Sequence, residues 1–193
     1  MRDILLRTFV AIPIPETIRP VYAKLKATVP GSGLKIKWVR SDLMHLTLKF
    51  LGYTPESSVE DVRSVFAKLV KPQSAFNLSI CNTGCFPKPE RPRVLWMGIE
   101  GDLDHLKNLV NQINSGLEPL GFLVEEKSFV PHLTIARIRY PQKKTPDITS
   151  FLNISFDPIP VAVNKIQFIS SELFSNGPVY SILSTHFFGN NSI

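Results

Sequence analysis

One four-residue pattern occurs twice in the chain, and it contains side chains that can do acid–base chemistry. The first copy is His45-Leu46-Thr47-Leu48, and the second is His132-Leu133-Thr134-Ile135. Each copy is a histidine, an apolar residue, a threonine and a second apolar residue. Successive side chains of a β-strand point to opposite faces, so the histidine and threonine of each copy would share one face. The sequence therefore predicts two strands that each present an imidazole beside a hydroxyl.

Two such strands could transfer a phosphoryl group if their imidazoles face each other. Attack at phosphorus needs one group to take a proton from the nucleophile and another to protonate the leaving oxygen. The ordinary pKa of histidine lies near neutrality, so His45 and His132 can divide these roles. Thr47 and Thr134 could donate hydrogen bonds to the phosphate oxygens on which charge builds up. Arg137, which follows the second copy, adds a fork-shaped cation that suits phosphate.

The repetition of the pattern matters more than either copy, because one histidine and threonine on a half-buried strand are usually structural. The chain contains four histidines, and half of them lie in the repeated pattern. We expect the other two, His105 and His186, to be solvated or structural. A zinc site is not expected at His45 and His132, because such sites need several ligands and neither copy contains a carboxylate or a further histidine. No cofactor is indicated.

The segments around the first copy predict the elements that would position it. Residues 6–12 are rich in β-branched and aromatic residues and predict a strand that two prolines end. A helix should follow, with the apolar stripe Ile18, Val21, Tyr22, Leu25 and Val29. After a turn at residues 31–33, residues 45–51 alternate as a strand does. Thr54 and Pro55 should begin a second helix, with the buried stripe Val59, Val62, Phe66, Leu69 and Val70.

The segments around the second copy predict a similar set of elements. Beside the strand of the motif we expect strands at residues 76–81, 94–99, 161–170 and 179–184. The proline-rich stretch at residues 86–89 is not helical and could border a site. Asp102 can cap a third helix, whose apolar stripe is Leu103, Leu106, Val110, Ile113 and Leu117. Strands and helices do not alternate regularly, which favours an α+β fold with antiparallel sheets and helices on their outer faces.

Length and composition indicate how many domains the chain forms, what kind of partner it binds and where it is located. A length of 193 residues suits a single domain spanning residues 1–193, with room for two lobes. Lys and Arg outnumber Asp and Glu by 22 to 16, which favours polyanionic partners without identifying one. No apolar run is long enough to span a membrane and the first residues do not resemble a signal peptide, so we expect a cytoplasmic protein. Cys81 and Cys85 should be unpaired thiols.

Several segments, taken in order, resemble the two-histidine phosphoesterases. Within them they resemble the branch called 2'-5' RNA ligase or RNA 2',3'-cyclic phosphodiesterase. The matching segments are both motifs, Arg91-Pro92-Arg93-Val94-Leu95-Trp96, and Pro131-His132-Leu133-Thr134-Ile135-Ala136-Arg137. The resemblance runs from residues 7–12 to residues 171–173 and so covers nearly the whole chain. The ordered set is far more specific than either tetrapeptide.

The resemblance implies both a fold and an activity. The fold would be bilobal, with two pseudo-symmetric antiparallel sheets around a central cleft lined by the two motifs. The activity would be metal-independent hydrolysis of a 2',3'-cyclic phosphate RNA end to a 2'-phosphomonoester, with weak reversible 2'-5' joining of RNA ends. Arg137 matches the basic residue that follows the second motif. By the same analogy His132 would activate water and His45 would protonate the departing 3' oxygen.

Substrate-binding residues are less clearly indicated than catalytic ones. Phe9 and Phe86 could stack on a nucleobase, although most of the 13 phenylalanines must belong to the core. Two basic groups either guide RNA toward the cleft or are solvated surface: Lys35, Lys37 and Arg40, and Lys88, Arg91 and Arg93. We expect the substrate to be RNA with a 2',3'-cyclic phosphate end and the protein to be a monomer.

Two alternatives to this activity remain open from the sequence. One is a noncatalytic RNA- or nucleotide-binding protein, against which the two intact motifs argue. The other is a phosphodiesterase for another small cyclic phosphate or nucleotide. The motifs suit both, because they contact phosphate and leave the rest of the substrate to the loops.

Overall fold

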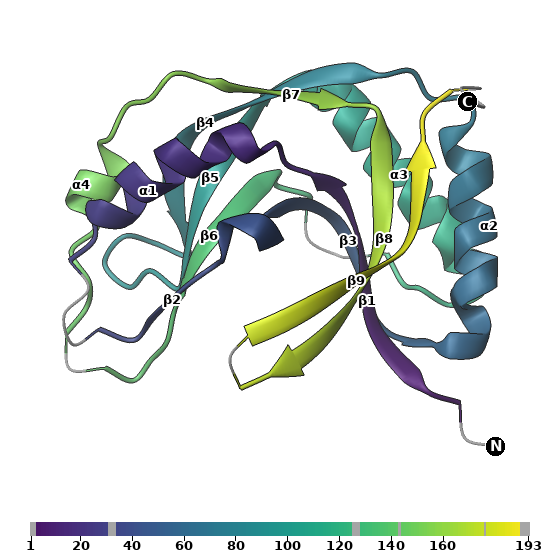
Figure 1. The fold of residues 1–193 in the computed structure, drawn as a ribbon, viewed down its shortest axis with the longest axis horizontal. Coiled ribbons are helices and arrows are strands. Elements are labelled where there is room, and N and C mark those ends of the chain that lie inside the picture. The colour runs from purple at the N-terminus through teal and green to yellow at the C-terminus, as the bar shows by residue number, and fades with distance from the viewer. Residues whose placement is uncertain (1–2, 31–33, 125–127, 143, 176, 190–193) are drawn as a thin grey trace.

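The computed structural model describes residues 3–30, 34–124, 128–142, 144–175 and 177–189. These residues form two antiparallel sheets that lie side by side, with helices packed around them (Figure 1). The α+β class and the two-sheet architecture predicted from the sequence are therefore confirmed. The turn predicted at residues 31–33 lies outside the described residues.

The first sheet contains the first motif. Its strand order is β3-β1-β8-β9, and every neighbouring pair is antiparallel. The strands are β1 (Leu5–Pro13), β3 (His45–Pro55), β8 (Lys165–Phe174) and β9 (Gly177–Phe187). β3 is an edge strand, so the first motif lies at the edge of this sheet.

The second sheet contains the second motif. Its strand order is β2-β6-β5-β4-β7, again antiparallel throughout. The strands are β2 (Ile36–Trp38), β4 (Phe76–Phe86), β5 (Val94–Gly101), β6 (His132–Ile138) and β7 (Ile159–Val163). β6 has only the three-residue strand β2 outside it, so the second motif also lies close to an edge.

The described residues form four α-helices and four short 3-10 turns. The helices are α1 (Arg19–Ala27), α2 (Val59–Val70), α3 (Leu103–Leu117) and α4 (Thr149–Leu152), and the turns are η1 (Glu16–Ile18), η2 (Ser41–Leu43), η3 (Glu56–Ser58) and η4 (Glu118–Leu120). The three predicted helices are present, and the short α4 was not predicted. α2 and α3 pack against each other and against the four-stranded sheet, while α4 packs on β4 (Figure 1).

The strands predicted at residues 76–81, 94–99 and 179–184 are present and longer than predicted. Two other predictions were wrong, both because of contacts distant in sequence. Thr54 does not begin a helix: it is buried in β3, where its hydroxyl forms a hydrogen bond of 2.7 Å with the hydroxyl of Thr8. The helix that follows begins after η3 instead. The strand predicted at residues 161–170 is two strands, because the chain leaves β7 at Asn164 and continues as β8 in the other sheet. The cap predicted at Asp102 is confirmed, since its carboxylate accepts a hydrogen bond of 3.1 Å from the backbone N–H of His105.

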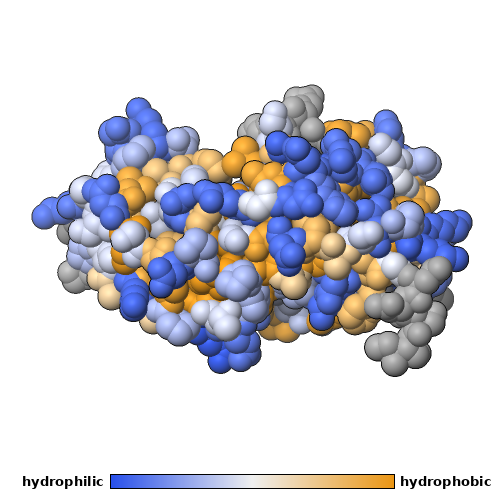
Figure 2. Space-filling view, turned by 90° about the horizontal axis from the view of Figure 1, so that it is seen from above, coloured by the Kyte–Doolittle hydropathy of each residue, from blue (hydrophilic) through white to orange (hydrophobic). Residues whose placement is uncertain are grey.

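A continuous hydrophobic core joins the two sheets. It includes Val10 and Leu46 from the first sheet and Leu95 and Leu133 from the second. A separate, smaller cluster consists of Phe9, Ala11 and Ile169 with Tyr180 packed against it. On the face shown in Figure 2, hydrophilic residues interrupt the hydrophobic surface.

Candidate active site

The two motifs meet where the sheets adjoin, because β3 and β6 contact each other. His45 is the first residue of β3 and His132 is the first residue of β6. Both histidines are half-buried, and so are Thr47 and Thr134. The structure thus places the four residues that the repeated pattern singled out on two strands that contact each other.

Each motif is followed at once by a β-bulge. In β3, Thr47 lies opposite Ala11 but Lys49 lies opposite Val10, so β3 has one extra residue there. In β6, Thr134 lies opposite Trp96 but Ala136 lies opposite Leu95, which is the same irregularity. Such an extra residue breaks the regular alternation of side chains between the two faces.

The bulges decide which residue joins the motif on its exposed face. Strict alternation would turn the residue three places after each threonine to the opposite face, toward the core. With the bulge, two consecutive residues are buried and the third is exposed, in the identical order in both strands. The third residue is Phe50 in β3 and Arg137 in β6. Arg137 therefore shares a face with His132 and Thr134, and Phe50 takes the corresponding place beside the first motif.

The two imidazoles are oriented in the same way. Nδ1 of His45 lies 2.8 Å from the carbonyl oxygen of Leu43, and Nδ1 of His132 lies 2.8 Å from the carbonyl oxygen of Val130. A carbonyl oxygen only accepts, so each Nδ1 carries the proton and donates it to this bond. Nε2 is then the nitrogen of each ring that can take up or release a proton.

Aromatic rings hold His45 in place from two sides. The ring of Phe9 stacks on the imidazole with centroids 4.6 Å apart, and the ring of Tyr180 meets it edge-on at 5.4 Å. This burial lowers the pKa of His45, although the hydrogen bond to Leu43 opposes the shift. The positive charge of Arg137 lowers the pKa further. In the free protein the environment thus favours neutral His45.

His132 has a different set of aromatic neighbours. Phe86 meets its imidazole edge-on at a centroid distance of 5.1 Å, and Trp96 lies at 6.5 Å. Trp96 in turn lies over Gly84 so closely that a Cβ atom on Gly84 would be 2.1 Å from the indole ring. Glycine is therefore required at position 84 for Trp96 to occupy its place beside His132.

Arg137 is exposed on β6, on the same face of the sheet as His132 and Thr134. Its positive charge lowers the pKa of His45. It also opposes the effect of burial on Tyr180, whose pKa is raised overall because burial has the larger effect. Both of those residues belong to the other sheet, so the charge of Arg137 acts across the junction of the sheets. Among the described residues no carboxylate forms an ion pair with Arg137. A guanidinium without such an ion pair, on the same face as an imidazole and a hydroxyl, suits a phosphate ligand.

Phe9 differs from the other predicted site residues in being almost fully buried, with 3% of its surface exposed. Its ring stacks on His45. The predicted contact of Phe9 with substrate stays a prediction. Three neighbours of the motifs were not predicted: Phe50, Trp96 and Tyr180. Comparing the residues three places after each threonine would have pointed to Phe50. Tyr180 gave no local signal, because it reaches His45 only through the pairing of β8 and β9.

A cavity of about 400 Å³ lies along the C-terminal half of β3, lined by Phe50, Tyr53, Phe122 and Leu123 among others, and neither motif contributes to its lining. No group of three or more His, Cys, Asp or Glu side chains that could hold a metal ion occurs within the described residues. Over the same residues, no helix is both long enough and apolar enough to cross a membrane. Cys81 and Cys85 are unpaired thiols, as the sequence predicted.

Comparison with known proteins gives a consistent result along the chain. Residues 12–96 and 99–180 match the family described as LigT-like phosphoesterases. An RNA 2',3'-cyclic phosphodiesterase of Thermotoga maritima is 34% identical over 178 residues, which cover 92% of this chain and 93% of that protein. A second protein of that name, from Aquifex aeolicus, is 33% identical over 95% of this chain and 97% of its own length.

Solved structures agree with the fold. The crystal structure of a Thermus thermophilus protein superposes with a TM-score of 0.80 at 28% identity, covering 96% of this chain and all of that one. The structure of E. coli LigT complexed with 3'-AMP has a TM-score of 0.74 at 22% identity, with 96% and 99% of the two chains covered. The second similarity concerns the fold alone.

Proposed function

Because the chain belongs to the LigT-like phosphoesterase family, we propose that it hydrolyses the 2',3'-cyclic phosphate at an RNA end to a 2'-phosphomonoester. The observation that carries this proposal is the matched orientation of two imidazoles on contacting strands, each with Nδ1 donating to a backbone carbonyl. Two relatives of similar length that share about a third of their residues with this chain have the same activity in their names.

In the proposed reaction both histidines act through Nε2. One Nε2 takes a proton from water as the water oxygen attacks phosphorus. The bond between phosphorus and the 3' oxygen breaks, and the other Nε2 gives its proton to that oxygen. The product is a 2'-phosphomonoester with a free 3' hydroxyl, and the two imidazoles have exchanged protonation states.

We assign activation of water to His132 and protonation of the 3' oxygen to His45, as the family resemblance implies. Burial lowers the pKa of His45, which disfavours the proton that an acid must carry. A bound phosphate would oppose this, because a nearby negative charge stabilises the imidazolium. Substrate binding would therefore be coupled to proton uptake by His45.

The remaining residues of the site would act on the phosphate and on the acid. Thr47 and Thr134 would donate to the nonbridging oxygens, whose charge grows as the water attacks. Arg137 would bind the same oxygens as a fixed cation. Phe9 would contribute to substrate binding by holding the imidazole of His45, on which it stacks at 4.6 Å.

We further propose that residues 1–193 act as one domain, as a cytoplasmic monomer that needs no metal or cofactor. The core shared by the two sheets supports a single folding unit. By family analogy, the same site would catalyse weak 2'-5' joining of RNA ends, since each proton transfer is reversible.

The test uses a short RNA with a 2',3'-cyclic phosphate end, incubated with the purified protein in EDTA. We expect a product heavier by one water whose terminal phosphate is at the 2' position and is removed by phosphatase. A 3'-phosphate product would contradict the proposed leaving group. RNA binding without turnover would favour a noncatalytic binding protein, and neither binding nor turnover would favour a different cyclic phosphate as substrate.

A further inference from the structure

A row of four exposed cations continues from the active site along β6 and β2. It consists of Lys35, Lys37, Arg137 and Arg139, all exposed, and is called the basic row below. Lys37 of β2 lies directly opposite Arg137 of β6. One step further along, the backbone N–H of Arg139 donates to the carbonyl oxygen of Lys35 at 2.9 Å. The basic row is thus two cross-strand pairs in succession.

The basic row lies on the same face of the sheet as the second motif. The bulge after Thr134 places Arg137 on that face, and residues directly opposite each other on paired strands point the same way. Lys37 therefore points to that face with Arg137. Lys35 and Arg139 lie two residues from Lys37 and Arg137, which returns their side chains to the same face.

The charges of the basic row are not balanced by acidic neighbours in the described part of the chain. None of its four residues forms an ion pair there. Arg40, only three residues after Lys37, differs: its guanidinium donates to both carboxylate oxygens of Asp42, at 3.1 and 2.6 Å. Like charges on directly opposed strand positions destabilise a sheet. Lys35 Nζ donates to the carbonyl oxygen of Pro141 at 3.2 Å, which leaves its charge unbalanced. A row of cations without acidic partners is therefore unfavourable for folding alone and suits the binding of a polyanion.

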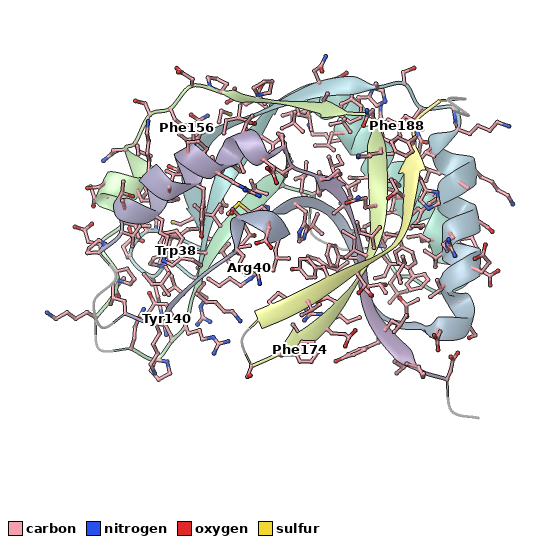
Figure 3. All side chains as sticks on the ribbon, in the orientation of Figure 1. Trp38, Arg40, Tyr140, Phe156, Phe174 and Phe188 are labelled. Carbon is pink, nitrogen blue, oxygen red and sulfur yellow. The ribbon has the colours of Figure 1, made fainter. Side chains whose placement is uncertain are left out.

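Further groups border the basic row. The guanidinium groups of Arg91 and Arg93 lie over the ring of Tyr140, at 5.1 and 5.8 Å from its centroid. Tyr140, which is labelled in Figure 3, directly follows Arg139. Arg91 and Arg93 therefore add positive charge at the end of the basic row away from the motifs. On another side the β8–β9 hairpin lies close to Lys37, because a Cβ atom placed on Gly177 would lie 3.9 Å from Nζ of Lys37.

We propose that Arg137 binds the terminal cyclic phosphate and that the rest of the basic row, Lys35, Lys37 and Arg139, binds successive phosphates of the RNA strand on its 5' side. In a 2',3'-cyclic end the 3' oxygen is closed in the ring, so the rest of the strand can leave the site only in the 5' direction. β6 leads from His132 and Thr134 to Arg137 and then to Arg139, in steps of about 7 Å for two residues. The protein is thereby selective for RNA ends over cyclic mononucleotides. This inference rests on the proposed function.

The test compares two substrates and two charge-matched variants. The substrates are an oligoribonucleotide with a 2',3'-cyclic phosphate end and a nucleoside 2',3'-cyclic monophosphate. The first variant combines Lys37→Gln with Arg139→Gln and leaves Arg137 in place. The control combines Lys68→Gln with Lys71→Gln, which removes the same charge from exposed positions in and just after α2.

We expect the first variant to raise KM for the oligonucleotide and to leave kcat unchanged, with no change for the mononucleotide. Each lost phosphate contact lowers the slope of log affinity against log salt by about 0.7 for a single strand, so two contacts lower it by about 1.4. The wild-type protein would then lose about sevenfold more affinity than the variant between about 50 and 200 mM salt. The control should follow the wild type.

Three outcomes overturn the inference. The first is an unchanged KM and salt slope in the Lys37→Gln, Arg139→Gln variant, and the second is an equal effect in the control. The third is an equal rise of KM for the mononucleotide. The same slopes are measured by fluorescence anisotropy with an RNA that ends in an ordinary 3'-phosphate. The basic row is therefore tested even if the wild type turns over neither substrate, which would refute the proposed function separately.

Discussion

Replacing Phe9 tests whether its ring positions His45 for the proposed protonation of the 3' oxygen. We expect Phe9→Leu to lower kcat, because a leucine cannot stack on the imidazole as the phenyl ring does at 4.6 Å. Stacked aromatic pairs contribute about 0.5–1.5 kcal/mol beyond the area that they bury. If the stacking stabilises the transition state by this amount more than the ground state, its loss lowers kcat by about two- to thirteenfold.

The same substitution should change the titration of His45. Leucine is smaller than phenylalanine and would let water approach the imidazole, so the pKa of His45 should rise toward its ordinary value. The measurement is NMR titration of labelled histidine rings, with the His45 signal assigned by its absence in His45→Ala. The resting pKa and kcat report on different states of the protein, so both are measured on each variant.

Phe66→Leu is the matched control for Phe9→Leu. Phe66 is also buried in aromatic surroundings, with ring centroids 5.6 Å from Phe168 and 5.7 Å from His186, but it lies on α2. Both variants should lose about 1 kcal/mol of unfolding free energy. Only Phe9→Leu should change kcat and the pKa of His45. Equal kcat values in the two variants would refute a positioning role for Phe9.

Three further outcomes follow from the structure. Arg137→Lys should raise KM about tenfold, because lysine keeps the charge but cannot bind phosphate through two parallel N–H groups. An unchanged KM would mean that only the charge of Arg137 contributes to binding. Burial lowers the pKa of His45 and of His186, so the unfolded chain binds these protons more tightly than the folded one. The free energy of unfolding should therefore be highest above the ordinary histidine pKa and should fall as the pH drops through the lowered pKa values of the folded protein. Urea titrations at several pH values would measure this fall. Gly84→Ala should displace Trp96, with a loss of about 1–3 kcal/mol and a shift of tryptophan fluorescence. An unshifted spectrum would contradict the close approach of the indole ring to Gly84.

Much of the fold follows from local patterns in the sequence. The alternation at residues 45–51 and the apolar stripes of the three longer helices correspond to β3, α1, α2 and α3. Thr54 was placed wrongly because its role depends on Thr8, which is 46 residues away in sequence. The break at Asn164 was missed because nothing local distinguishes one long strand from two strands that belong to different sheets.

The site shows the same division between local and distant causes. The repeated pattern was enough to identify the histidines and threonines that β3 and β6 bring together. Strict alternation would have turned Arg137 away from them, and its place on the exposed face depends on a bulge that composition does not reveal. Tyr180 entered the site through sheet pairing alone. A short motif can therefore single out the groups that we propose react, while the residues that contact them come from the whole fold.

The most direct test of the paired acid and base is the pH dependence of RNA cyclic-phosphate hydrolysis by His45→Ala and His132→Ala, with His105→Ala as the control. We expect a bell-shaped profile for the wild type and the control. Each active-site variant should lose about 10²–10⁴-fold in rate and also the limb of the profile that its histidine supplies. Full activity in either His45→Ala or His132→Ala would contradict the paired mechanism.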